Sequence, residues 1–168
     1  MLIITGTMGA GKTSVLGESS DLLSRRHIAH AAVDVDALGL AQLPSGAAND
    51  AAMYGNLESV CKNYAALGVQ RIILARAVET RADLERCREI VPAERTVVCR
   101  LTAAIRTMEQ RVTIRETGVL QPEFVARVAA LNAILERAQL EDFSVINENR
   151  PLTDVAVEML TKARWISN

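Results

Sequence analysis

A segment near the start of the chain has the residue types and spacing of a phosphate-binding loop. It reads Gly6-Thr7-Met8-Gly9-Ala10-Gly11-Lys12-Thr13 and matches the pattern G-x-x-x-x-G-K-[ST]. Its glycines let successive backbone N–H groups converge on phosphate oxygens, and Lys12 adds a mobile positive charge for the β- and γ-phosphates. The Thr13 hydroxyl is suited to bind Mg²⁺, and Ser14 lies where it would contact the α-phosphate. We therefore expect ATP or a similar nucleotide, with Mg²⁺, to bind here.

An aspartate pair follows an expected strand at residues 28–35. Asp34 and Asp36 are two residues apart, so both carboxylates lie on one face of an extended chain. Ligands bind at the carboxyl ends of strands in open parallel sheets, which predicts that the pair lies beside the phosphate loop. We expect Asp34 to serve Mg²⁺ and catalysis and Asp36 to contact an acceptor, although either one is suited to deprotonate it. A role in capping the loop is the alternative, because aspartate favours turns.

Arg76 directly follows another expected strand, at residues 71–75. At that position its guanidinium is suited to bind an anionic acceptor or the transferred phosphoryl group through paired hydrogen bonds. Simple solvation at the surface is the alternative, because most arginines are exposed.

Two further arginines, Arg111 and Arg115, are four residues apart on an expected helix and therefore share one face. They precede an expected loop at residues 116–121, so they are suited to close over the nucleotide and stabilise charge during phosphoryl transfer. Pairing with glutamates of the same segment is the alternative.

The elements that must position these residues alternate along the chain. Short apolar runs alternate with longer helical ones, which is typical of an α/β protein with a parallel sheet. The expected strands are residues 2–5, 28–35, 71–75, 96–99 and 143–146. The expected helices are residues 11–26, one that Gly68 ends, 80–90, one capped by Thr102 and ended by Gly118, 122–139 and 153–163. In the second helix, the apolar stripe of Met53, Leu57, Val60, Tyr64 and Leu67 predicts a buried face.

Composition limits the classes of partner. The 168 residues are 49% hydrophobic but only 3% aromatic, which predicts one domain with an aliphatic core. The net charge of −1, without a Lys/Arg tract, argues against nucleic acid as a partner. The first apolar run, residues 2–4, is too short for a membrane span or a signal peptide, which predicts a cytoplasmic protein without membrane partners. The oligomeric state stays open.

The chain resembles small P-loop kinases of the shikimate, gluconate, adenylylsulfate and nucleotide kinase group. The phosphate loop, the aspartate pair, Arg76 and the arginines of residues 111–115 carry this resemblance. It implies a P-loop NTPase fold, a three-layer sandwich with a five-stranded parallel sheet in the order 2-3-1-4-5. It also implies one domain over residues 1–168, with an acceptor-binding region at about 37–67, an arginine-bearing lid at about 106–121, and adenine near residues 147–151 and Arg111.

The sequence also departs from members of this group. Ala75-Arg76-Ala77 replaces the glycine-rich turn of shikimate kinases, the D-G-[FY]-P-R segment of adenylate-type kinases is absent, and residues 72–74 lack a Walker B aspartate. Metal binding would then fall to Thr13, Asp34 and water. The sequence thus predicts an ATP-dependent phosphotransferase acting on a small-molecule hydroxyl or phosphate. The alternative is a nucleotide-binding regulator or slow NTPase without such an acceptor.

Overall fold

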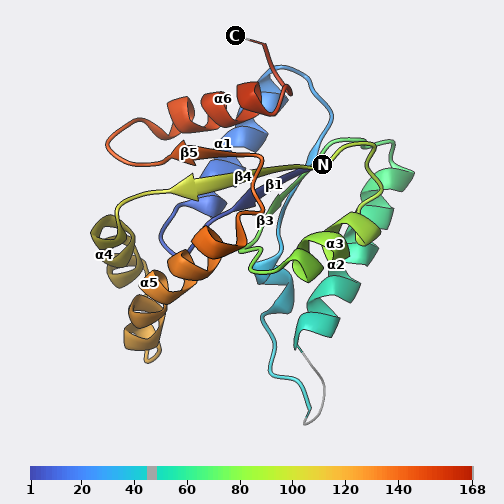
Figure 1. The fold of residues 1–168 in the computed structure, drawn as a ribbon. Helices are drawn as coiled ribbons and strands as arrows, with labels where there is room; N and C mark the ends of the chain where they lie inside the picture. The colour runs from blue at the N-terminus through green and yellow to red at the C-terminus, as the bar shows by residue number, and fades with distance from the viewer. Residues whose placement is uncertain (45–48, 168) are drawn as a thin grey trace.

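A five-stranded parallel sheet forms the centre of the computed structural model, which describes residues 1–44 and 49–167 (Figure 1). The strands are β1 (Leu2–Thr5), β2 (Ala31–Asp34), β3 (Ile72–Ala75), β4 (Val97–Thr102) and β5 (Phe143–Ile146). Their order is β2-β3-β1-β4-β5, and every neighbouring pair is parallel. Ile3 of the central strand lies opposite Leu74 on one side and Val98 on the other. The predicted strand order is confirmed.

Helices cover both faces of this sheet. They are α1 (Lys12–Arg25), α2 (Asn49–Ala66), α3 (Arg81–Ile90), α4 (Ile105–Arg115), α5 (Gln121–Ala138) and α6 (Leu152–Lys162), with a 3₁₀ turn η1 (Asp36–Gly39) after β2. Helix α1 packs on α6, α2 contacts α3, and α4 packs on α5 where the chain leaves β4 (Figure 1). None of the helices described is long and apolar enough to cross a lipid bilayer.

The alternation of side chains along the strands creates two separate apolar cores. Leu2 and Ile4 of β1 pack into the core that includes α1 and α6, whereas Ile3 packs into the core that includes α2 and α3. The same alternation holds in β3, where Ile73 and Leu74 lie in different cores. Strands buried on both faces read as continuous aliphatic runs, as these do. The three-layer α/β architecture follows from this pattern.

Strand β4 is longer than the sequence predicts. It extends to Thr102, which therefore ends a strand and does not cap α4; the residue before α4 is Ala104. The extension contains Arg100, a residue that normally argues against a buried strand. Its guanidinium binds the Asn132 side chain at 3.0 Å and pairs with Glu141 at 3.5 Å. These partners are distant in sequence, so a local pattern could not predict them.

Two other element boundaries, and the buried face of α2, also differ from those predicted from the sequence. Strand β2 begins at Ala31, and α4 ends at Arg115, before Gly118. Met53 and Leu57 are buried as predicted, but Leu67 is 80% exposed, and the other residues of 62–68 are also exposed. The buried face of α2 consists of Met53, Tyr54, Leu57 and Cys61. The stripe fails because the last turns of α2 extend beyond the layer on which its first turns pack.

This correction predicts different costs for two leucines of the same stripe. Leu57→Ala should lower the free energy of unfolding by about 2–5 kcal/mol, because Leu57 is fully buried and a cavity would remain. Leu67→Ala should change it by less than about 0.5 kcal/mol. Denaturant unfolding of both variants measures the difference, and equal losses would contradict the observed exposure of Leu67.

Candidate nucleotide and acceptor site

The phosphate loop connects β1 to α1 and is closely packed from behind. Gly9 and Gly11 have φ angles of +77° and +94°, which residues with side chains rarely adopt. A Cβ atom on Gly9 would lie 2.3 Å from the Met108 carbonyl oxygen. One on Gly11 would lie 2.2 Å from Nδ2 of the Asn147 side chain. These two positions therefore require glycine for their backbone conformation and for their close contacts.

Three side chains hold carbonyl oxygens of this loop. Asn147 Nδ2 donates to Ala10 O at 2.8 Å, Arg111 Nη1 to Gly9 O at 3.2 Å, and Lys12 Nζ to Gly6 O at 3.0 Å. Helix α1 begins at Lys12 without a capping side chain, so its first N–H groups lack an intrahelical or side-chain acceptor. The loop carbonyls are therefore occupied, while the N–H groups at the positive end of α1 are free. Such N–H groups suit the binding of a nucleotide's phosphates.

The predicted loop residues do not all offer the same groups. The Thr7 hydroxyl donates to Val128 O at 3.2 Å, Met8 packs against the α1/α6 core, and Ala10 is fully buried. Thr7, Met8 and Ala10 can therefore contact phosphate only through their backbone. The Ala10 N–H donates to Thr7 O at 3.2 Å, so it is already bonded within the loop. Ser14 is exposed in the first turn of α1.

Thr13 and Asp34 lie together at the carboxyl end of β2. The Thr13 hydroxyl donates to Asp34 Oδ2 at 2.7 Å. A hydroxyl and a carboxylate are the oxygen ligands that suit Mg²⁺, which normally keeps several waters and uses few protein groups. Within the described residues no group of three or more acidic, His or Cys side chains forms a metal site. The Thr13–Asp34 pair fits a Mg²⁺ ion whose other ligands are phosphate oxygens and water.

The charged groups around the loop affect one another. Burial lowers the pKa of the Lys12 ammonium; Asp36 and Asp34 oppose this effect and Arg115 adds to it. Loss of hydration raises the pKa of the Asp36 carboxyl, although its side chain stays 56% exposed, and Lys12 and Arg76 oppose this effect. The charged side chains predicted for the site are thus close enough that each affects the pKa of Lys12 or of Asp36. They are Lys12, Asp34, Asp36, Arg76 and Arg115. The raised pKa makes Asp36 a stronger base than an ordinary aspartate.

Arg76 is not a solvated surface residue. Its side chain is 12% exposed, and Nη1 lies 3.6 Å from Asp36 Oδ1. The same nitrogen donates to Met53 Sδ at 2.9 Å, and the guanidinium carbon lies 5.0 Å from the centre of the Tyr54 ring. Arg76 therefore lies between the aspartate pair and α2, on the side predicted to receive an acceptor.

The two predicted lid arginines of α4 have different partners. Arg111 donates to Gly9 O and, at 2.9 Å, to Asn147 O, so it joins α4 to the phosphate loop. Arg115 Nε pairs with Glu116 at 2.6 Å, as the alternative interpretation of this residue predicts. It also lies close enough to Lys12 to lower the pKa of that lysine. Arg111 is therefore fixed at the loop, whereas Arg115 is an exposed group beside it.

Two residues after β5 contact the phosphate loop and the start of α4, which the sequence patterns did not predict. Asn147 is buried, and its backbone N–H donates to Thr102 O at 2.8 Å while its side chain holds the loop. The Glu148 carboxylate accepts from the Ala104 N–H at 3.3 Å and from the Thr107 hydroxyl, so it joins the segment after β5 to the start of α4. An uncharged polar residue directly after the expected last strand, at the carboxyl edge of the sheet, was the available signal.

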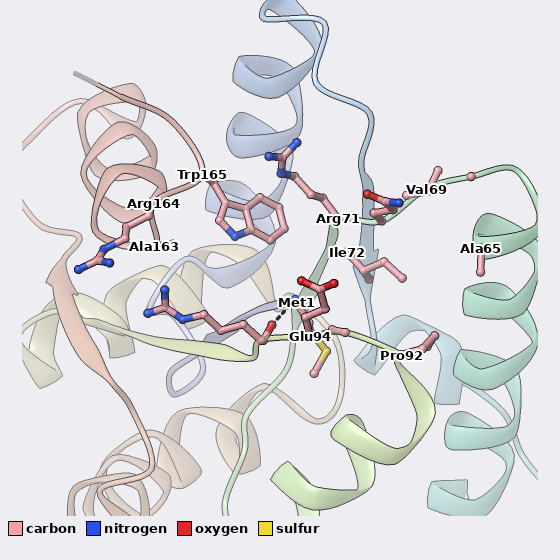
Figure 2. Close-up of a pocket in the computed structure, with 14 residues that line it drawn as sticks. Met1, Ala65, Val69, Arg71, Ile72, Pro92, Glu94, Ala163, Arg164 and Trp165 are labelled. Carbon is pink, nitrogen blue, oxygen red and sulfur yellow. Dashed lines mark hydrogen bonds between the residues drawn. The ribbon is translucent and has the colours of Figure 1, made fainter.

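A hollow of about 740 Å³ lies at the other end of the sheet (Figure 2). It is lined by residues at the amino ends of strands, among them Met1 and Ile72, and by Trp165 from the segment after α6. None of the predicted site residues lines it, so the size of a hollow does not locate the candidate site in this protein.

Comparison with known proteins finds similarity in structure only. No family model and no curated protein matches the sequence. The shikimate kinase of Acinetobacter baumannii, solved with shikimate, is 18% identical with a TM-score of 0.64, covering 98% of this chain and 92% of its own. A gluconokinase of Sinorhizobium meliloti 1021 is 16% identical with a TM-score of 0.62, covering 98% and 91%.

The APS kinase of Mycobacterium tuberculosis, solved with AMPPNP and APS, is also similar. It is 16% identical with a TM-score of 0.62, covering 97% of this chain and 96% of its own. Identities this low establish the fold alone. The fold is that of small P-loop kinases, and the resemblance seen in the sequence is confirmed at this level.

The packing of the loop predicts opposite effects for two glycine substitutions. Gly9→Ala should destabilise the protein by at least about 1 kcal/mol, because the new Cβ meets the Met108 carbonyl at a positive φ. Gly17→Ala in α1 should stabilise it by about 0.5–1 kcal/mol, because a Cβ there meets nothing within 4 Å. Denaturant midpoints test both, and a neutral Gly9→Ala would contradict the packed loop.

Proposed function

We propose that this protein is an ATP-dependent phosphotransferase that transfers the γ-phosphoryl group to a hydroxyl or phosphate of a small molecule. The observation that carries the proposal is the 2.7 Å contact between Thr13 of the phosphate loop and Asp34 of β2, with Asp36 beside it. This contact joins a nucleotide-binding motif to carboxylates that suit metal binding and proton transfer. The kinases of similar fold, solved with shikimate or with AMPPNP and APS, agree with this reaction class.

In this proposal residues 6–14 bind the nucleotide. The free N–H groups of the loop and of the start of α1 receive phosphate oxygens, and Lys12 leaves the Gly6 carbonyl to bind the β- and γ-phosphates. Thr13 and Asp34 would hold a Mg²⁺ ion, whose charge would offset that of the phosphates. Arg111 and Arg115 add positive charge from α4, where the predicted lid lies.

The acceptor binds on the side of Asp36 and Arg76. Asp34 already accepts from Thr13, so we assign proton removal to Asp36, whose pKa is raised. The acceptor oxygen forms a bond to the γ-phosphorus while the bond from that phosphorus to the β–γ bridging oxygen breaks. ADP leaves with the bridging oxygen, and the hydroxyl proton passes to Asp36. A phosphate acceptor would need no such proton transfer.

The helices flanking this site form the proposed acceptor region and lid of a single domain. Turn η1 and helix α2 occupy the predicted acceptor region at about 37–67, of which residues 45–48 lie outside the described residues. Helix α4 occupies most of the predicted lid at about 106–121. Each region places a charged side chain near the loop, Asp36 from η1 and Arg111 from α4.

Lys12→Ala separates nucleotide binding from folding. MgATP at 100 times its dissociation constant should stabilise the wild type by about 2.7 kcal/mol, and Lys12→Ala should lose most of this effect. Without ligand the variant should melt no lower than the wild type. Because the pKa of Lys12 is lowered on folding, its charged form costs stability at neutral pH, and this cost fades as pH rises towards the unfolded pKa.

Thermal denaturation at pH 7 with and without MgATP measures both effects. A Lys12→Ala variant stabilised as much as the wild type would remove the basis of the proposal, whereas a large unliganded loss would show that Lys12 supports the fold.

Phosphoryl transfer is tested with labelled MgATP and a panel of sugars, sugar acids and nucleosides. Acceptor-dependent label transfer should fall at least about a hundredfold in Asp36→Asn, as expected on loss of a general base, and also fall in Asp34→Asn. Gly17→Ala serves as the active control. Label released only as slow free phosphate would instead favour the nucleotide-binding regulator.

A further inference from the structure

We propose that the hollow at the amino ends of the strands is a second ligand site, which binds a small aromatic anion: a flat ring that carries a phosphate or a carboxylate. Trp165 stacks on the ring, and Arg71 and Arg95 bind the charged group. The site lies at the opposite end of the sheet from the phosphate loop. It therefore goes beyond the proposed function and does not depend on it.

The strand order places two arginines on either side of the central strand. Arg71 directly precedes β3, and Arg95 lies two residues before β4. Because β3 and β4 both pair with β1, the two arginines flank Met1, and all three residues line the hollow of about 740 Å³. Neighbouring strands lie about 4.8 Å apart, so the two arginine backbones are about 10 Å apart. A small ligand between them is within reach of both side chains.

The hollow is positively charged, although the chain as a whole has a net charge of −1. Its lining includes the three arginines Arg71, Arg95 and Arg164 but a single acid, Glu94. In the described part of the chain, no ion pair or side-chain hydrogen bond uses any of these three guanidinium groups, and Glu94 pairs with no cation. Uncompensated positive charge along a concave wall attracts anions, and guanidinium donors match the oxygens of a phosphate or carboxylate.

Trp165 offers a fixed aromatic surface in this hollow. Part of its side chain packs against the α1/α6 core, and the indole also lines the hollow. The turn that ends α6 holds it, because the Trp165 N–H donates to Leu160 O at 2.9 Å and the Arg164 N–H donates to Thr161 O at 2.9 Å. Arg164 has a φ of +60°, the left-handed conformation that closes such a turn. A ring that stacks on this indole therefore needs little ordering of the protein.

The arrangement of these groups requires a ring and a charge on one molecule. Figure 2 shows the Arg71 side chain extending alongside the Trp165 indole, whereas the Arg164 side chain turns to the other side of it. Inorganic phosphate would use the arginines alone, and a neutral ring would use the indole alone. The volume of the hollow is within the range of about 300–1,000 Å³ that is usual for small-molecule sites. A nucleoside monophosphate and an aromatic carboxylate share the chemistry that fits.

The fluorescence of Trp165 reports on this hollow, because it is the only tryptophan in the chain. Emission is followed while AMP and adenosine, nicotinate and nicotinamide, or inorganic phosphate are titrated. Saturable quenching is expected with AMP or nicotinate, at an affinity at least about tenfold higher than that of the neutral counterpart or of phosphate. The two anions show whether phosphate or carboxylate is preferred. No saturable change with either anion up to about 10 mM, or equal affinity for the neutral partner, would overturn the inference.

Substitutions assign the binding to the arginines. Arg71→Gln and Arg95→Gln should each lower the affinity for the anion about tenfold to a hundredfold, as expected on loss of charged hydrogen bonds, whereas Glu94→Gln should raise it. Arg81→Gln is the matched control, because Arg81 is an exposed arginine at the other end of α3. All four side chains are exposed, so the variants should melt with the wild type. Unchanged affinity in both Arg71→Gln and Arg95→Gln would contradict the assigned site.

The Lys12→Ala variant separates this site from the phosphate loop. The response of Trp165 to AMP and nicotinate should keep the same Kd in this variant, because the loop lies at the other end of the sheet. Loss of the response in Lys12→Ala would show that the ligands act through the phosphate loop and would overturn the inference. Failure of MgATP to stabilise the wild type, with the Trp165 response intact, would overturn the proposed function alone.

Discussion

The fit of the phosphate loop against the backbone behind it is the constraint on which the rest of the site depends. Gly9 lies against the Met108 backbone carbonyl and Gly11 against the Asn147 side-chain amide. Both contacts are so close that neither position has room for a Cβ. Donors from outside the loop then fix its carbonyls. Because its carbonyls are bound on one side, the loop presents its remaining N–H groups on the other. Helix α1 starts from this loop, and its own first N–H groups are free. The loop is thus organised before any nucleotide binds, which lowers the entropic cost of binding.

The same contacts connect the loop to α4 and to the segment after β5. Arg111 spans from α4 to Gly9 O and Asn147 O, and Glu148 binds the start of α4 through the Ala104 N–H and the Thr107 hydroxyl. The first half of α4 is therefore fixed to the loop. The exposed Ile114 and Val119 lie beyond Arg111, and among the described residues no hydrogen bond joins residues 112–120 to the loop. In the proposed lid, adjustment to a bound nucleotide would thus fall to the segment after Arg111.

Local patterns predicted part of this arrangement, and contacts between distant residues account for the rest. The phosphate loop, β1, β5 and α3 follow from short stretches of sequence, and all are observed. The extension of β4 through Arg100 depends on Asn132 and Glu141, and the loop contact of Asn147 spans 137 residues. The burial of Arg76 likewise depends on α2 packing beside β3. Such partners become visible only when the sheet order brings them together.

The charges at the carboxyl edge of the sheet suggest how the order of binding would matter in the proposed reaction. Lys12 is the strongest of the cations that lower the pKa of Asp36. When the phosphates of a nucleotide bind Lys12, they neutralise this cation and add negative charge nearby, so the pKa of Asp36 rises further. Asp36 then becomes a better base once the phosphoryl donor is bound. Arg76 becomes its principal remaining cation. Proton removal is therefore favoured most once the nucleotide is in place.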